Sequence, residues 1–209
     1  MSGELLELQL GDEPRSWSAA GFVLAGPNRD AVVLDGVVLR LVGRSKGVGI
    51  LAWHISGVAD EIDGLSSSGH VPILDELPHP NGVSSIDHIV VETFDFDRSI
   101  RAFNAAGLND RRTRKFLVGG SERQQTFFWA GSVIVETIGE VKPTGEGPSV
   151  LWGLALVSED LESTAQYLGD LISRPKAAVQ SGRQIATLRT TELDISMPVA
   201  VMTPHGRST

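Results

Sequence analysis

One pattern of apolar and polar positions dominates the second half of the chain. Residues 86–92 form the β-branched run Ile-Asp-His-Ile-Val-Val-Glu, which is typical of a strand. Asp95 follows at a position suited to a helix N-cap, and Phe96, Ile100 and Phe103 then recur at helical spacing. Three further strands are predicted over 112–118, 124–129 and 132–138. The predicted order is one strand, one helix and three strands.

The same order returns 65 residues later. Asp160 corresponds to Asp95, and Leu161, Ala165 and Leu168 repeat the helical spacing of the first copy. A strand is predicted over 151–157 and a helix over 159–168, followed by strands over 177–180, 183–190 and 197–202. The repeat indicates two copies of one supersecondary unit.

Weaker copies open the chain. A strand is predicted over 5–10, a short helix over 13–20 and a strand over 37–43, whose sequence is similar to 133–139. Residues 50–56 are typical of the first strand of a fourth copy, in which 60–63 match the helix start at 159–162.

A stretch rich in Ser, Pro and Gly, residues 64–85, has the composition of a linker. We therefore predict a degenerate N-terminal βαβββ pair with its linker over 1–82, and a fuller C-terminal pair over 83–209.

The composition narrows the classes of function. The chain has 209 residues, 41% of them hydrophobic, a net charge of −8 and no cysteine. The negative charge disfavours nucleic acid and anionic membranes as partners, and the lack of cysteine excludes disulfides and thiolate chemistry. We expect a cytoplasmic protein whose partner is a small organic ligand, and we leave open whether it is a monomer or a homodimer.

Paired βαβββ units resemble the vicinal oxygen chelate superfamily, which contains glyoxalase I, bleomycin-resistance proteins and extradiol dioxygenases. The resemblance is carried by residues 86–91, the helix from Phe96 to Phe103, residues 106–108 and residues 133–139. It implies an α+β fold in which tandem βαβββ units curl into half-open barrels around a pocket. It does not by itself fix an activity, because the superfamily hosts many.

The resemblance also implies where a metal would bind. In the superfamily, divalent metal ligands come from the first and last strands of each unit. His88 and Glu136 match these places in the first C-terminal unit, whereas Gly153 and Met202 occupy them in the second. The implied cofactor is one divalent ion, Zn, Ni, Mn or Fe, but the incomplete ligand set favours none being bound.

The N-terminal pair is depleted in the same way. Arg40 stands where Glu136 would be, and its positive charge opposes a metal. His54 falls at the position of His88 in the fourth copy.

Further ligand contacts are predicted on other strands. Arg123, Gln125, Phe127 and Trp129 alternate along one strand and share a face. Whether that face lines the pocket or packs against the core is open at this stage. The other candidate ligand-binding residues are Trp152, Gln180, Arg183 and Met202.

Two classes of function follow. The first is a small-molecule-binding protein with an incomplete metal site. The second is a metal-dependent lyase, isomerase or dioxygenase that uses His88 and Glu136 with waters or His54. A metal-free enzyme in which His88 or Glu136 is the general base is a third hypothesis.

Overall fold

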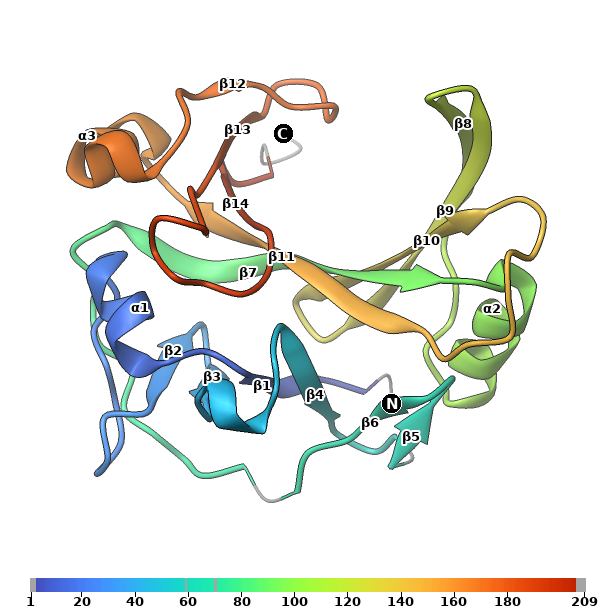
Figure 1. Ribbon diagram of the computed structural model, residues 1–209, viewed down its shortest axis with the longest axis horizontal. Helices are drawn as coiled ribbons and strands as arrows, with labels where there is room; N and C mark the ends of the chain where they lie inside the picture. The colour runs from blue at the N-terminus through green and yellow to red at the C-terminus, as the bar shows by residue number, and fades with distance from the viewer. Residues whose placement is uncertain (1–2, 59, 70, 206–209) are drawn as a thin grey trace.

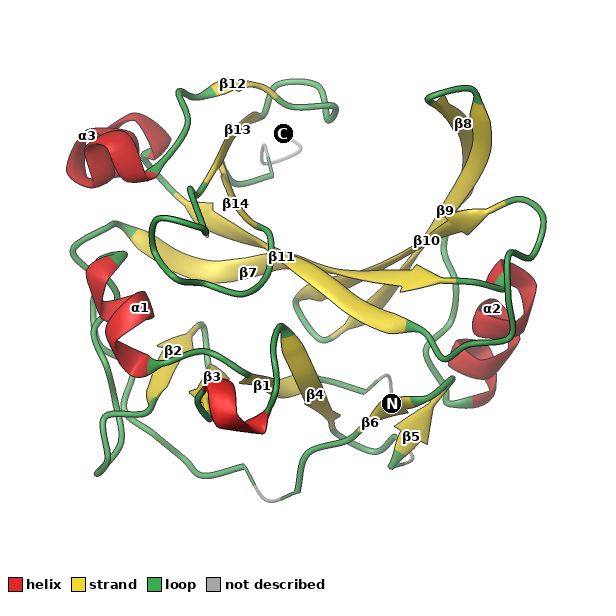
Figure 2. Ribbon diagram, in the orientation of Figure 1, coloured by secondary structure: helices red, strands yellow, loops and turns green. Residues whose placement is uncertain are grey.

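The computed structural model describes residues 3–58, 60–69 and 71–205. It contains a four-stranded sheet and an eight-stranded sheet that pack against each other, with three helices at their margins (Figures 1 and 2). The smaller sheet is formed by the blue part of the chain in Figure 1, and the larger by the green, yellow and red parts.

The four-stranded sheet has the order β2-β3-β1-β4. Its strands are β1 (Leu5–Leu10), β2 (Ala31–Leu34), β3 (Val37–Leu41) and β4 (Ile50–Ile55), with helix α1 (Pro14–Ala19) after β1 and a 3-10 turn at Arg44–Lys46. β1 runs parallel to β3 and antiparallel to β4. With β4 assigned to the next unit, as its sequence predicts, only β2 and β3 follow α1 in the first unit, which is one strand short of the βαβββ pattern.

The segment after β4 differs from the expectation of a helix start at 60–63. It forms a hairpin of β5 (Glu61–Ile62) and β6 (Leu65–Ser66). Asp63 and Gly64 form its turn, with φ angles of 52° and 82°. An Asp-Gly pair adopts this left-handed conformation readily and favours a tight hairpin over a helix.

The eight-stranded sheet has the order β12-β13-β14-β11-β7-β10-β9-β8. Its first copy comprises β7 (Val83–Thr93), α2 (Phe96–Ala105), β8 (Thr113–Val118), β9 (Ser121–Ala130) and β10 (Val133–Glu140). Its second comprises β11 (Val150–Ser158), α3 (Leu161–Leu168), a 3-10 turn at Gly169–Leu171, β12 (Lys176–Ala177), β13 (Gln184–Thr187) and β14 (Val199–Met202). In each copy the first strand runs parallel to the last, and β7 pairs with β11 at the centre.

The two copies also match in their helix-start hydrogen bonds. Asp95 accepts from the backbone N–H of Arg98, and Asp160 accepts from that of Ser163, so each aspartate caps its helix. The strand before each helix is tied to it by a hydroxyl pair, Thr93–Ser99 at 2.5 Å in one copy and Ser158–Thr164 at 2.7 Å in the other.

A single hydrophobic core lies between the sheets and includes residues from both. Trp53 of β4 meets Phe103 of α2 edge-on with 5.9 Å between the ring centroids, and Phe103 stacks on Phe128 of β9 at 5.0 Å. The other face of the eight-stranded sheet is not covered by the smaller sheet. It curls between β8 at one end and β12 at the other (Figure 1). Among the described helices, none is long and apolar enough to cross a membrane.

Candidate functional site

The concave face of the eight-stranded sheet collects most of the candidate residues. Ile134 pairs with both His88 and Trp129, and Glu136 pairs with Phe127. Because side chains alternate along a strand, every second residue of β7, β9 and β10 points to this face. The inward set is His88, Val90, Glu92, Arg123, Gln125, Phe127, Trp129, Ile134, Glu136 and Ile138. The neighbouring residues Ile89, Val91, Phe128, Val133 and Val135 are buried in the core instead.

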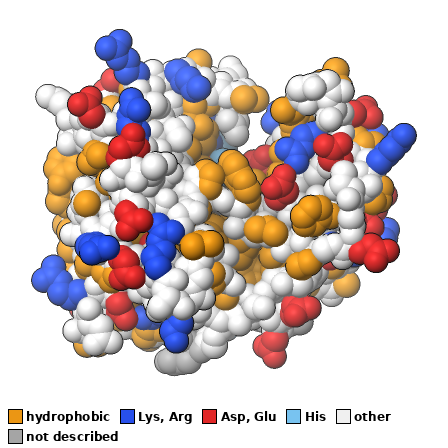
Figure 3. Space-filling view, in the orientation of Figure 1, with side chains coloured by type: hydrophobic (Ala, Val, Ile, Leu, Met, Phe, Trp, Pro, Cys, Tyr) orange, Lys and Arg blue, Asp and Glu red, His pale blue; other side chains and the backbone are white. Residues whose placement is uncertain are grey.

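The space above this face is visible as a cleft in Figure 3. It separates the part of the molecule that contains α3 from the projecting β8–β9 hairpin, and hydrophobic side chains line its floor. Residues 111–115 form a basic run that is exposed at the start of the β8–β9 hairpin rather than in the centre of the face. Within it, Arg114 lies over the ring of Phe116 at 5.7 Å.

His88 and Glu136 stand side by side at the centre. Nε2 of His88 lies 3.7 Å from a carboxylate oxygen of Glu136, and each side chain is 15% exposed. Gln125 donates from Nε2 to the other oxygen of Glu136 at 3.0 Å. Burial raises the pKa of the Glu136 carboxyl, and the nearby charges of His88 and Arg114 oppose that rise. The pair therefore forms a half-buried polar centre in an otherwise largely apolar face.

A β-bulge brings a third group to this centre. Ala155 pairs with His88 and Leu156 pairs with Ile86, which leaves Asp87 without a partner across β11. A bulge of this kind turns two consecutive side chains toward one side of the sheet. Nδ1 of His88 lies 2.7 Å from Oδ2 of Asp87 as a result.

Arg183 anchors Asp87 from the other end of the sheet. Its Nη2 lies 2.5 Å from Oδ1 of Asp87, and the two side chains are only 3% and 2% exposed. Its Nε donates to the carbonyl of Thr203 at 2.8 Å, and His205 lies 3.3 Å from the same Asp87 oxygen. Burial opposes ionisation of Asp87, but the hydrogen bonds and charges of His88 and Arg183 outweigh it and lower the pKa to about 2.

Asp87 was not among the residues predicted from the sequence. Strict alternation places it on the opposite face from His88, and a bulge leaves no reliable mark in a single sequence. The adjacent pair Asp-His was the only available signal.

The remaining predicted residues are more dispersed. Arg123 forms an ion pair with Glu92 at 2.8 Å. Trp129 is 41% exposed and Trp152 is 48% exposed. Gln180 is exposed, and its backbone carbonyl accepts from Arg183 N–H at 3.2 Å, so it belongs to the turn before β13. Met202 is buried and pairs with Val157 and Ile185.

The residues at the implied metal positions do not form a ligand set. Gly153 offers no donor, and a Cβ there would stand 2.8 Å from the carbonyl oxygen of Pro198. In the first copy, Glu136 pairs with Val90. The residue of the second copy that corresponds to Val90 is Ala155, and it pairs with Ala200 rather than with Met202. Within 3–58, 60–69 and 71–205, no group of three or more His, Cys, Asp or Glu side chains is placed to hold a metal ion. The donors present therefore do not fit a tightly held divalent ion.

His54 is placed away from this site, contrary to its proposed role as a ligand beside His88. Its neighbour Trp53 is in the core between the sheets, so His54 points to the opposite face of the four-stranded sheet. There its Nδ1 lies 2.9 Å from the carbonyl of Ser68. Arg40 shares that face and is paired with the buried Glu7 at 3.0 Å.

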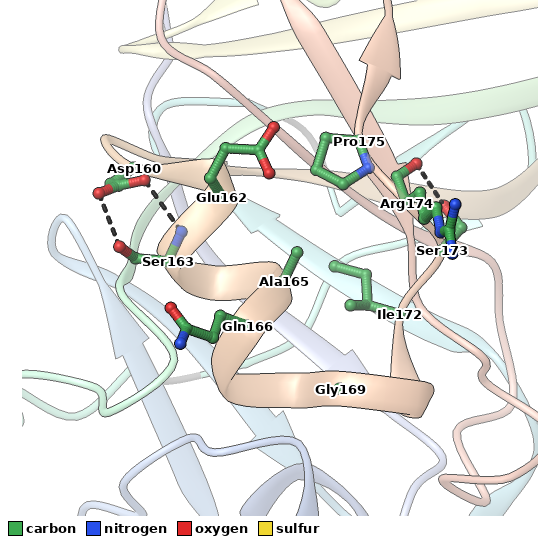
Figure 4. A pocket seen from close by; sticks show the side chains of 10 residues that line it. All are labelled: Asp160, Glu162, Ser163, Ala165, Gln166, Gly169, Ile172, Ser173, Arg174 and Pro175. Carbon is green, nitrogen blue, oxygen red and sulfur yellow. Dashed lines mark hydrogen bonds between the residues drawn. The ribbon is translucent and has the colours of Figure 1, made fainter.

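A cavity of about 220 Å³ adjoins the Asp87 end of the concave face. Its lining includes Asp87, Trp129, Ile134 and His205. A larger hollow of about 440 Å³ lies beside α3, between Asp160 and Pro175 (Figure 4). There Asp160 is already engaged by the N–H and hydroxyl of Ser163, at 2.9 and 2.7 Å. We favour the smaller cavity, because polar side chains with buried partners converge beside it.

Comparisons with solved structures identify the fold. A triple mutant of 4-hydroxymandelate synthase from Streptomyces coelicolor is similar over 100% of this chain and 94% of its own, with a TM-score of 0.64 and 14% identity. A catechol 2,3-dioxygenase is similar over 100% of this chain and 95% of its own, with a TM-score of 0.58 and 12% identity. No protein-family model and no curated protein matches the sequence.

The chain therefore has the paired βαβββ fold of these two solved structures. The predicted fold class, α+β with tandem βαβββ units, is confirmed. At identities of 14% and 12% the likeness concerns the fold alone, so the activities of these two enzymes are not transferred to this chain.

Proposed function

We propose that the concave face of the eight-stranded sheet binds a small organic molecule, and that it does so without a tightly held divalent metal. The observation that carries the proposal is the largely buried pair of His88 and Glu136, joined by Gln125. The cavity of about 220 Å³ is lined not by this pair but by its neighbours Asp87 and Ile134, which lie next to His88. A few converging polar groups within an apolar hollow are what a ligand pocket requires.

The aromatic side chains of β9 beside the polar centre suggest the shape of the ligand. Trp129 and Phe127 come from one strand and present aromatic surface beside the polar centre. A flat apolar body would lie against these rings while its polar end reaches His88 and Glu136. The small cavity favours a molecule of modest size.

Mapping by NMR tests whether small molecules bind at the concave face. A library of small aromatic compounds is screened, and amide shift changes in the ¹⁵N-labelled protein locate each binder. We expect the shifts to centre on β7, β9 and β10. Trp129→Ala should weaken binding about tenfold or more, the scale of losing one well-packed aromatic contact. Glu162→Gln, in the hollow beside α3, is the matched control and should leave binding unchanged. Compounds whose shift changes map to α3, or whose affinity is the same for Trp129→Ala and the wild type, would contradict the proposal.

Calorimetry tests the metal part. Titration with Zn²⁺, Ni²⁺ and Mn²⁺, together with elemental analysis of protein purified without chelators, should show no stoichiometric ion. Two donors leave most of the coordination sphere to water, so retention through purification is not expected. A stoichiometric ion that is lost in His88→Ala would instead support the metal-dependent enzyme.

A further inference from the structure

Resting on the proposed function, we infer that Asp87 is a positioning residue that fixes the proton of His88 on Nδ1, so that the site presents two acceptors and takes a ligand bearing an O–H or N–H donor. The acceptors are Nε2 of His88 and the facing carboxylate oxygen of Glu136. The class of ligand is therefore an alcohol, phenol, amine or amide N–H compound rather than a ketone or a carboxylate.

The first step concerns which ring nitrogen holds the proton. A carboxylate can only accept hydrogen bonds, so Oδ2 of Asp87 at 2.7 Å requires a proton on Nδ1 of His88. The buried contact with Arg183 keeps Asp87 ionised and prevents it from turning away. In the neutral ring, Nε2 then carries the free lone pair.

The second step concerns what faces that lone pair. The Glu136 oxygen is 3.7 Å away, which is too long for a hydrogen bond, and two acceptors would not form one. Gln125 already occupies the other oxygen of Glu136. A donor atom placed between Nε2 and this oxygen can lie about 3 Å from both. An acceptor placed there would leave two partly buried acceptors unsatisfied.

Asp87→Asn reverses the arrangement without changing the shape of the side chain. The cationic Arg183 can only donate, so the amide oxygen of Asn would turn toward it. The amide NH₂ would then face Nδ1 of His88, and the ring proton would move to Nε2. The site would present a donor where the wild type presents an acceptor.

Two other histidines supply references for the two tautomers. Nδ1 of His79 accepts from the backbone N–H of Val23 at 3.0 Å, so its proton is on Nε2. Nδ1 of His54 faces the carbonyl of Ser68 and must therefore carry the proton. The ¹⁵N shifts of histidine-labelled protein at pH 8.5, well above the ordinary imidazole pKa of about 6.5, distinguish these states.

We expect His88 to match His54 in the wild type and His79 in Asp87→Asn, while both references keep their shifts. A wild-type His88 with its proton on Nε2 would overturn the inference before any variant is made. An unchanged His88 in Asp87→Asn, in protein whose amide spectrum shows the native fold, would overturn it as well.

A matched pair of neutral probes tests the ligand class. 1-Phenylethanol and acetophenone share one carbon framework, but only the alcohol has a donor. Because the ketone would leave the buried acceptors of the site without a donor, the alcohol should bind wild type about tenfold more tightly, and Asp87→Asn should abolish that preference. Equal binding of the two probes to wild type, or tighter binding of the ketone, would overturn the ligand class. A native tautomer pattern together with a screening library that binds only elsewhere would instead refute the proposed function and leave the role of Asp87 standing.

Discussion

Asp87 and Trp152 are the unpaired residues of β-bulges at matching places in the two copies, 65 residues apart, and β7 has a further irregularity at Ser84. The β7 bulge falls between the pairs of Ile86 and His88, and the β11 bulge falls between those of Leu151 and Gly153. The two copies thus share this irregularity of the strand, although a different residue stands at it in each. One copy uses the bulge to bring a carboxylate to a histidine, and the other uses it to expose an indole.

The ion pair of Asp87 should make stability depend on pH in the acid range. Its folded pKa of about 2 lies below the ordinary value of 3.8, so its stabilisation is complete above about pH 4 and is lost as the pH falls through 2. The shift corresponds to about 2 kcal/mol. We expect Asp87→Asn to be less stable than wild type by about that amount at pH 6, with the difference shrinking below pH 4. Urea denaturation of both proteins across this range measures it, and a constant difference would be the contrary result.

Ionisation of Glu136 should lower the stability of the folded protein, the opposite of the effect of Asp87. Its raised pKa means that the folded state favours the protonated acid, so ionisation costs stability once the pH rises above the ordinary value of 4.5 and through the folded pKa. Glu136→Gln should therefore stabilise the protein at pH 7 to 8 by roughly 0.5–1 kcal/mol and have little effect at pH 4. Thermal unfolding at both pH values is the measurement. A variant less stable than wild type at pH 8 would show that the carboxylate is better satisfied than its single bond from Gln125 indicates.

Asp63 should be a major stabilising residue outside the site. Its side chain is only 5% exposed, and it accepts from Arg98 Nε at 2.6 Å and from the hydroxyls of Ser99 and Ser149 at 2.5 Å each. It thereby ties the β5–β6 hairpin to α2 of the other sheet. Asp63→Ala should cost about 3 kcal/mol, because it leaves a guanidinium and two hydroxyls without their acceptor.

The matched control for this loss is Asp35→Ala. Asp35 has a similar left-handed φ of 49° but is exposed. Asp35→Ala should lower the free energy of unfolding by only about 1 kcal/mol, which is the penalty for a left-handed backbone that both positions share. Equal losses in the two variants would mean that the hydrogen bonds of Asp63 contribute nothing beyond its turn.

Gly153 should tolerate no side chain. The nearest atom to an added Cβ is the carbonyl oxygen of Pro198 at 2.8 Å, and that oxygen also accepts from Leu154 N–H. Gly153→Ala should cost about 1–3 kcal/mol through this clash. Gly69→Ala, with open space around the added carbon, should be neutral to within about 0.5 kcal/mol. Chemical denaturation compares them, and a stable Gly153→Ala would show that β14 can shift.

The repeated unit was predictable because its signals are local. The capping aspartates and the apolar spacing of α2 and α3 follow from helix geometry, and both appeared as expected. His88 and Glu136 could be brought together because the resemblance implied that the first and last strands of each unit supply ligands to one pocket. The hairpin at 61–66 differs from the prediction because the acidic run 60–63 resembles the helix start at 159–162, with Glu61 in the place of Asp160, whereas Asp63 and Gly64 form a turn.

The rest of the site depends on long-range geometry. Arg183 and Asp87 are 96 residues apart, and no local spacing relates them. The constant offset from Glu136 ends at Val201 and the sequence prediction takes Met202 beside it, whereas the strand pairing of the second copy puts Ala200 at that place. His54 lies on a correctly predicted strand, but its side chain is on the face of the four-stranded sheet that points away from the eight-stranded sheet.

The core that runs between the sheets bears on how the chain folds. Trp53 before the linker packs against Phe103 after it. Both belong to one cluster of buried residues whose members come from the whole span between Leu5 and Val201. A four-stranded sheet stripped of this contact would expose a whole apolar face to water. The two halves are therefore expected to melt in a single cooperative transition, and a cut near residue 82 should yield two fragments that regain native structure only when mixed.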